Sequence, residues 1–184
     1  MAATSSPSCS PGTPIPRFSL NDVVSGNTYS PESFPGGSGL LVAFICRHCP
    51  YVVHMREELA AIAREFSPQG MATVAISSND ALAYPEDAPP KLREMAAQLP
   101  FPLLYDESQD VAKAFGAVCT PDLFLYDSRG GLFYRGRLDD SSPGNGKPVT
   151  GSELRAAIQA LLAGTPPPLV QLPSIGCSIK WKKS

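Results

Sequence analysis

The sequence has no large excess of charge of either sign and no long apolar run. Its 15 basic and 17 acidic residues give a net charge of −2, so the chain offers nucleic acid no electrostatic attraction. No apolar stretch approaches the length needed to cross a bilayer. Residues 1–16 are rich in Ser, Pro and Thr, without the basic start and apolar core of a secretory signal. We therefore expect a cytoplasmic protein with no nucleic-acid or membrane partner.

Residues that bind metals are also sparse and poorly paired. The chain has two histidines and five cysteines, and beyond Cys46-x-x-Cys49 it contains no second CxxC and no HxxxH. A structural zinc site needs about four ligands, usually from two such pairs. An odd number of cysteines also argues against a framework in which every cysteine forms a disulfide. The pattern favours redox chemistry over metal binding, and we expect no metal and no cofactor.

The hydrophobic pattern predicts alternating strands and helices. Apolar runs indicate strands at 40–45, 71–76, 101–105, 123–126 and 132–135. Apolar residues that recur every three or four positions indicate helices at 52–66, 91–99, 108–116 and 150–164. Thr150 and Glu153 form a capping box for the last helix, and the polar, proline-rich residues 77–90 indicate a loop. This order predicts an α/β fold with a central mixed sheet and helices on both of its faces.

The domain organisation follows from composition and length. A chain of 184 residues is long enough to bury one core, and the periodic pattern places that domain at residues 16–164. We expect residues 1–15 to form a flexible tail. Residues 165–184 form a proline-led C-terminal tail that could pack on the domain.

Cys46 and Cys49 are the most informative residues of the chain, because they follow a buried strand and open a helix. The free N–H groups of a helix start favour a thiolate, which is the reactive form of cysteine. We expect Cys46 to be the partly exposed nucleophile, and the more buried Cys49 to resolve the mixed disulfide. Arg47 and His48 add positive charge that would stabilise the thiolate and the reduced form, unless both side chains are simply solvated.

Three further stretches resemble the thioredoxin fold, and within it the alkyl hydroperoxide reductase/thiol-specific antioxidant branch. Pro16-Arg17-Phe18-Ser19-Leu20 through Phe34 is similar to the N-terminal "P-x-F-x-L…G" hairpin of that branch. Residues 106–126 resemble its "D…VAKAYG…TP…FL-x-D" segment, and residues 130–136 resemble its "G-x-x-x-Y-x-G" strand. The resemblance covers residues 15–163. It implies a thioredoxin-like domain with an added N-terminal β-hairpin.

The residues around the dithiol differ from those of both related groups. The strand before Cys46 has no acidic residue, so the buried proton acceptor of thioredoxins is missing from it. Gly39 and Ala43 stand where peroxiredoxins have proline and threonine. The resemblance implies a thiol–disulfide oxidoreductase that acts on protein or small-molecule disulfides, with thioredoxin or glutathione as the reductant. The alternatives are a peroxiredoxin-like peroxidase with Cys46 as the peroxidatic cysteine, and a redox-sensing binding module without turnover.

Thr120, Pro121 and two more cysteines complete the candidate site. Thr120-Pro121 resembles the cis-proline of the family, which would leave the Thr120 backbone free to pair with a substrate strand. Cys119 would then lie near the CxxC as a third redox thiol, unless it is only a small buried side chain. Cys177 has the same spacing to Trp181-Lys182 as the resolving cysteine of typical two-cysteine peroxiredoxins. We therefore consider Cys119 and Cys177 as additional redox thiols.

Overall fold

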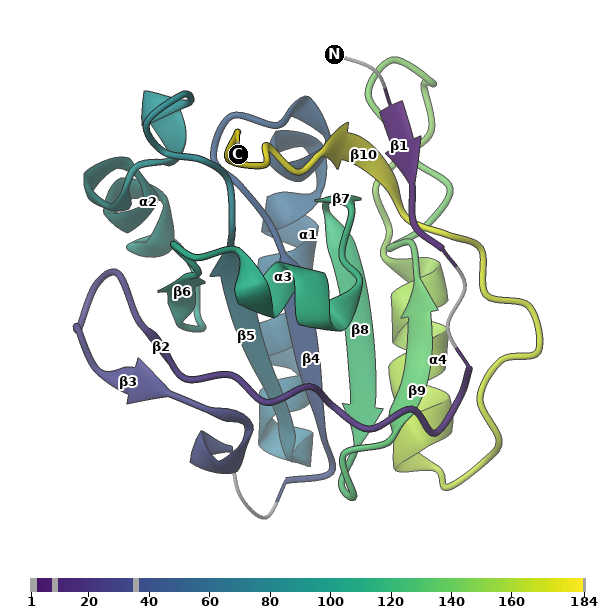
Figure 1. Ribbon diagram of the computed structural model, residues 1–184. Coiled ribbons are helices and arrows are strands. Elements are labelled where there is room, and N and C mark those ends of the chain that lie inside the picture. The colour runs from purple at the N-terminus through teal and green to yellow at the C-terminus, as the bar shows by residue number, and fades with distance from the viewer. Residues whose placement is uncertain (1–2, 8–9, 35–36, 184) are drawn as a thin grey trace.

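A five-stranded mixed sheet forms the centre of the computed structural model, which describes residues 3–7, 10–34 and 37–183 (Figure 1). Its strands are β4 (Gly39–Phe44), β5 (Met71–Ser77), β6 (Leu103–Tyr105), β8 (Asp122–Asp127) and β9 (Leu132–Gly136). They lie in the order β6–β5–β4–β8–β9. Strands β4, β5 and β6 are parallel, while β8 runs antiparallel to β4 and β9 antiparallel to β8. The predicted mixed sheet is confirmed.

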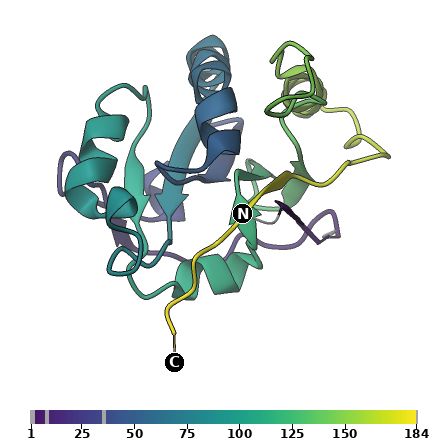
Figure 2. The same cartoon turned by 90° about the horizontal axis from the view of Figure 1, so that it is seen from above.

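Strand β4 is buried on both faces and separates two hydrophobic clusters. Its side chains alternate, as period-two geometry requires: Leu41 and Ala43 join one cluster, and Leu40, Val42 and Phe44 join the other. The first cluster lies under α1 (Pro50–Phe66), α2 (Pro89–Ala96) and α4 (Ser152–Leu162). The second lies under α3 (Asp110–Phe115). Figure 2 shows α1 and α4 on one face of the sheet and α3 on the other.

Short elements complete the domain. The expected N-terminal hairpin is present as β2 (Leu20–Asn21) and β3 (Thr28–Tyr29). The 3-10 helices are η1 (Pro31–Ser33), η2 (Ser67–Gln69) and η3 (Pro85–Asp87). Helix η3 lies within the segment 77–90 that we expected to be a loop. In the part of the chain that the structure describes, no helix is both long and apolar enough to cross a membrane.

The start of α4 differs from the predicted capping box. Its N-cap is Gly151, not Thr150, and no side chain of the cap residue closes the helix. Instead, Asp139 Oδ2 accepts hydrogen bonds from the N–H groups of Thr150 and Gly151, both at 2.6 Å. Glu153 forms an ion pair with Arg137. The buried carboxylate of Asp139 therefore caps the start of α4, in place of the Thr150 hydroxyl that we expected to do so.

The two ends of the chain meet in a second sheet above the first (Figure 1). Strand β10 (Ile175–Ser178) lies between β1 (Ala3–Ser5) and β7 (Cys119–Thr120), antiparallel to both. The expectation of a flexible tail at 1–15 is wrong for its described residues. Ser6 N–H donates to the Ser174 carbonyl at 3.1 Å, and Ile15 N–H donates to that of Gly130 at 2.8 Å. In a free tail these backbone groups would form hydrogen bonds with water, whereas here they form them with the rest of the domain.

Candidate active site

Cys46 and Cys49 lie between the end of β4 and the start of α1. Helix α1 begins at Pro50, where a missing N–H costs little, and Cys49 is its N-cap. Both thiols are buried: Cys46 is 1% exposed and Cys49 is 0% exposed. The expectation of a partly exposed Cys46 is therefore wrong. Its sulfur is covered because Thr120 Oγ1 lies 3.3 Å from it, and the side chains of His48 and Asp87 pack on another side.

The two thiols have opposite acidities. A hydrogen bond from the Cys46 thiol to Cys49 raises the pKa of Cys46, and burial and the charge of Asp87 raise it further. The same hydrogen bond lowers the pKa of Cys49, with additional donors in the Cys177 thiol and the Val52 N–H at the start of α1. In the neutral dithiol, Cys49 donates to the Thr120 carbonyl at 3.1 Å. The directions of these shifts make Cys49 the more acidic thiol of the pair, whereas we expected Cys46 to be.

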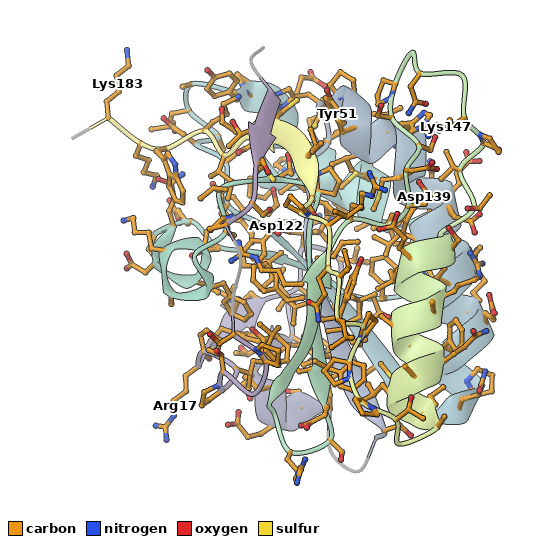
Figure 3. All side chains as sticks on the ribbon, turned by 90° about the vertical axis from the view of Figure 1, so that its right-hand side faces the viewer. Arg17, Tyr51, Asp122, Asp139, Lys147 and Lys183 are labelled. Atoms are coloured by element: carbon orange, nitrogen blue, oxygen red, sulfur yellow. The ribbon has the colours of Figure 1, made fainter. Side chains whose placement is uncertain are left out.

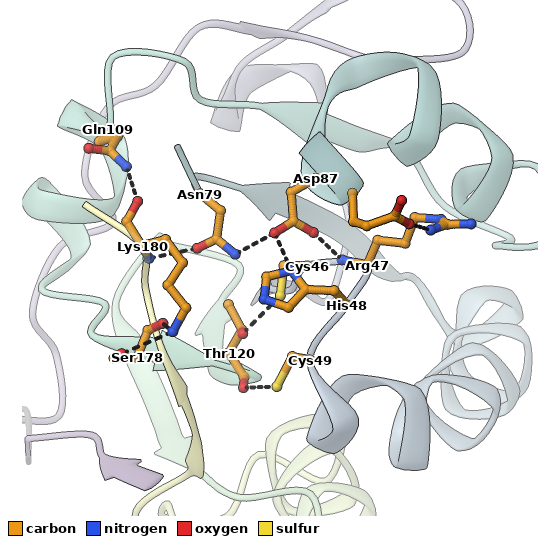
Figure 4. A network of polar contacts seen from close by, with 11 residues as sticks. Cys46, Arg47, His48, Cys49, Asn79, Asp87, Gln109, Thr120, Ser178 and Lys180 are labelled. Atoms are coloured by element: carbon orange, nitrogen blue, oxygen red, sulfur yellow. Dashed lines mark hydrogen bonds and ion pairs between the residues drawn. The ribbon is translucent and has the colours of Figure 1, made fainter. Parts of the chain in front are cut away.

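A buried acid supplies the proton acceptor that we expected to be missing. Asp87 in η3 is 0% exposed, and its Oδ2 lies 2.6 Å from His48 Nδ1 (Figure 4). The backbone N–H of Arg47 donates to its Oδ1 at 2.8 Å, and Asn79 Nδ2 donates to its Oδ2 at 2.7 Å. These partners compensate the cost of burying the charge. Asp87 and Asn79 follow β5, which runs parallel to β4, so both strands bring their carboxyl ends to one edge of the sheet.

The sequence contains a signal for this acid. Polar residues directly after one parallel strand are candidates for contact with residues directly after its neighbour. Asn79 meets this condition relative to the CxxC, and Asp87 lies eight residues further along the same connection. The sequence gives no reason to choose Asp87 over the nearby Asp80 or Glu86.

Arg47 and His48 differ in their surroundings. Arg47 forms ion pairs with Glu86 and, at 3.3 Å, with Glu94, so its guanidinium is directed to surface carboxylates. The expectation that it stabilises a Cys46 thiolate is therefore not met by its contacts. His48 lies beside both the sulfur and the buried acid, and its ring stacks on Tyr84 with centroids 5.7 Å apart. Of the two intervening residues, His48 is the one placed to move a proton.

Cys46, His48 and Asp87 also form the one group of potential metal ligands found among the described residues, with one ligand atom from each within 4.8 Å of the others. However, His48 Nδ1 and Asp87 Oδ2 are already at ion-pair distance from one another. Both carboxylate oxygens also accept hydrogen bonds. The donor set thus fits an acid–base group beside a thiol better than a metal centre.

Thr120 and Pro121 lie directly opposite the dithiol, and the bond between them is cis. The Thr120 hydroxyl contacts Cys46 and its carbonyl contacts Cys49, so one residue touches both sulfurs. The substrate-pairing edge that we predicted at Thr120 is occupied by β10, in which Cys177 is the partner of Thr120. Beside Pro121 is a cleft lined also by Tyr51 and Asp139, which Figure 3 shows near β10 and near α4, respectively.

The two additional cysteines have different environments. Cys119 is 0% exposed, its Sγ lies 3.4 Å from Ser6 Oγ, and burial raises its pKa to about 12. These contacts favour a packed thiol over a redox one. Burial also raises the pKa of Cys177 to about 12, and the neighbouring Cys49 thiol, which belongs to the same hydrophobic cluster, raises it further. Cys177 thus lies beside the dithiol, whereas the sulfur of Cys119 faces Ser6, which follows β1.

The chain is similar to known proteins in sequence and in structure. A model described as the AhpC/TSA family matches residues 11–135. No curated protein matches the chain. The chain is 48% identical to a conserved protein from Geobacillus kaustophilus whose structure is described as uncharacterized, with a TM-score of 0.97 over 100% of this chain and 98% of that one. It is also 48% identical to a hypothetical protein from Sinorhizobium meliloti, with a TM-score of 0.96 over 98% of this chain and 100% of that one.

More distant structures share the fold alone. A thiol:disulfide interchange protein from Chlorobium tepidum is 18% identical, with a TM-score of 0.64 over 84% of this chain and 99% of that one. This likeness confirms the thioredoxin-like fold that the sequence motifs predicted.

Proposed function

The chain belongs to the AhpC/TSA family, and on this premise we propose that it is a thiol–disulfide oxidoreductase in which Cys46 and Cys49 alternate between dithiol and disulfide. Family membership supports thiol-based redox chemistry. The observation that carries the finer proposal is that Thr120 contacts both sulfurs, with its hydroxyl 3.3 Å from Cys46 Sγ and its carbonyl 3.1 Å from Cys49 Sγ. Cys49, whose pKa is lowered, therefore lies where it can attack a mixed disulfide that forms on Cys46.

Cys46 is the thiol that we assign to the first attack. Its neighbours Arg47 and His48 are partly exposed, whereas Cys49 lies beneath Thr120 and β10. As Cys46 attacks one sulfur of a substrate disulfide, its proton passes to the adjacent His48–Asp87 pair. A mixed disulfide forms and one substrate thiol leaves. Cys49 then attacks Cys46 Sγ, the second substrate thiol leaves, and the Cys46–Cys49 disulfide remains. A cellular thiol such as glutathione or thioredoxin would restore the dithiol.

The enclosed site favours a small-molecule disulfide as the substrate. The edge of β7, where an extended polypeptide would pair, already carries β10. A protein disulfide would need β10 to leave, whereas a small disulfide needs only an opening beside His48. Turnover of oxidised glutathione and of insulin, measured with the same thiol reductant, tests this preference.

The two cysteine variants test the assignment of roles. Cys46→Ser should abolish turnover of oxidised glutathione. Cys49→Ser should accumulate a mixed disulfide on Cys46, visible as a glutathione adduct by mass spectrometry. A Cys49→Ser protein with full turnover and no adduct would contradict the dithiol mechanism.

Peroxide reduction is the second candidate. The family match is compatible with it, and the buried Cys46 suits a substrate as small as a hydroperoxide. Attack of Cys46 on a hydroperoxide would yield an alcohol and a Cys46 sulfenic acid. Cys49 would then form the disulfide and release water. The raised pKa of Cys46 does not separate the two candidates, because both begin with attack by the Cys46 thiolate. Rapid hydroperoxide consumption by Cys49→Ser, with no disulfide turnover by the wild type, would favour this candidate.

A further inference from the structure

Strand β10 is seated on the active site by close backbone packing. Cys177 is the cross-strand partner of Thr120, and Ser178 that of Cys119. At Gly176 the backbones are so close that an added Cβ would lie 2.1 Å from the Thr120 carbonyl oxygen. Only glycine permits this approach, because the obstructing atom belongs to the backbone and cannot turn away. The register that brings Cys177 opposite Thr120 is therefore set by Gly176.

The side chain of Cys177 faces the dithiol. Residues directly opposite each other in an antiparallel pair point to the same face. Thr120 points to the dithiol, since its hydroxyl lies 3.3 Å from Cys46 Sγ, and Cys177 must point the same way. Cys177 is 3% exposed and belongs to the same hydrophobic cluster as Cys49. Three cysteines from two distant segments therefore meet in one buried site.

The segment around Cys177 is held at both ends. Before β10, Ser174 Oγ donates to the Gly136 carbonyl at 2.8 Å. After β10, Lys180 N–H donates to Asn79 Oδ1 at 2.8 Å, and Gln109 Nε2 donates to the Lys180 carbonyl at 2.8 Å. Asn79 also binds Asp87, so the anchor of β10 and the acid beside Cys46 belong to one network (Figure 4).

We propose that Cys177 is a third redox thiol of this site, which exchanges with Cys49 to form a Cys49–Cys177 disulfide. The proposal rests on the proposed function, which supplies the Cys46–Cys49 disulfide. Cys177 attacks Cys49 Sγ, the Cys46–Cys49 bond breaks, and the Cys49–Cys177 bond forms. The proton that Cys177 loses is taken up at Cys46, so atoms and oxidation state balance. Cys46 returns to its thiol form beside His48 and Asp87 while the protein remains oxidised.

This exchange gives the site a second oxidised state. In the first state the disulfide closes the short CxxC loop, and β10 is held only by non-covalent contacts. In the second state β10 is bonded to the N-cap of α1, and the nucleophile is free to form another mixed disulfide. The nearby Cys119 has no such role, because its sulfur contacts Ser6 and the Pro121 carbonyl instead.

The test uses the full chain with Cys46→Ser, which removes the competing Cys46–Cys49 disulfide. The reduced variant is treated with oxidised glutathione, quenched with acid, alkylated and digested. We expect tandem mass spectrometry to find Cys49 linked to Cys177 in most of the protein. Cys46→Ser combined with Cys119→Ser is the matched control and should give the same link. Cys46→Ser combined with Gly176→Val keeps both thiols but displaces β10, and should reduce the linked fraction at least tenfold.

The outcomes separate this proposal from the proposed function. A Cys177 that stays alkylatable while Cys49 carries glutathione would overturn the exchange, even if the wild type turns over disulfides. A Cys49–Cys177 link in a protein whose wild type shows no turnover would support the third thiol and reject only the enzymatic function. If Cys46→Ser is poorly folded, trapping partly oxidised wild type at the same quench should still reveal the Cys49–Cys177 peptide, and its absence there also overturns the proposal.

Discussion

The carboxylate of Asp87 lies 2.6 Å from the imidazole of His48, although the two residues belong to different connections of the fold. His48 lies in the CxxC turn after β4, and Asp87 in η3 after β5. The strands are parallel neighbours, so these connections emerge at the same edge of the sheet. The dithiol thereby gains an acid–base pair, with a buried carboxylate and a partly exposed imidazole, that no residue of β4 could provide.

Asp87→Asn should separate the two effects of this acid. Removing its charge should lower the pKa of Cys46, because that charge helps to raise it. Removing the proton acceptor should nevertheless slow disulfide turnover by about 10²-fold, the lower end of general acid–base contributions. The measurement is kcat/KM against pH. Glu86→Gln, in the same short helix, is the control and should retain wild-type turnover. Equal turnover in both variants would contradict a role for Asp87 in proton transfer.

The acidity of Cys49 gives a second prediction. Cys46→Ala removes a hydrogen-bond donor to the Cys49 thiolate, and bonds to charged groups contribute about 1.5–3 kcal/mol. The pKa of Cys49 should rise by about one to two pH units as a result. Cys46→Ser keeps a hydroxyl donor and should change it less. Thiolate absorbance against pH reports both values.

Cys49→Ser completes this set. It should remove the thiolate absorbance at neutral pH, because burial still raises the pKa values of Cys46, Cys119 and Cys177, and the charge of Asp87 adds to this at Cys46. Persistence of the signal in Cys49→Ser would mean that Cys46 is the ionised thiol after all.

The sequence predicted those features that depend on neighbours along the chain. The apolar run before Cys46 and the helical spacing after Pro50 are local signals, and β4 and α1 lie where those signals indicated. The family motifs added the N-terminal hairpin and the Thr120-Pro121 segment opposite the dithiol. Together these features were sufficient to predict the fold and to identify Cys46 and Cys49 as the candidate redox pair.

Features that depend on distant partners escaped prediction. Strand β1 is only three residues long and pairs with β10 near the opposite end of the chain. Neither segment has a strong strand pattern of its own, since β10 contains Gly176 and a serine. The same limit applies to Asp87, whose role depends on the parallel register of β4 and β5. Burial of Cys46 followed from these unforeseen neighbours.

Arg47 and His48 should differ in their influence on the redox couple. Arg47→Gln should leave the reduction potential of the Cys46–Cys49 pair unchanged, because its guanidinium is paired with exposed carboxylates, and such pairs contribute about 0–1 kcal/mol. His48→Gln should shift the potential and slow turnover, since it removes the ring beside Cys46 and Asp87. Equilibration with glutathione buffers measures both variants. A larger shift of the potential in Arg47→Gln than in His48→Gln would mean that the exposed guanidinium does influence the redox couple.

Gly176→Val tests whether β10 restricts access to the site. The new side chain would collide with the Thr120 carbonyl, and such overpacking costs about 1–3 kcal/mol. Because β10 lies at the surface of the domain, displacement of the strand is the expected relief. Hydrogen exchange should then become faster for the amides of 176–179. The freed edge of β7 should accept a substrate strand, so insulin reduction should increase while reduction of oxidised glutathione changes little.

Ile175→Ala is the matched control for this prediction, because Ile175 is on the same strand but 47% exposed. It should leave both hydrogen exchange at Cys177 and the preference between substrates close to wild type. The informative contrast is therefore between two substitutions in adjacent residues, one directed at the Thr120 backbone and one toward solvent. If Gly176→Val stays folded but loses turnover of both substrates together, β10 is required for the chemistry itself and does not act as a cover. That result would be expected if the contact between Cys177 and Cys49 helps to hold the thiolate in place.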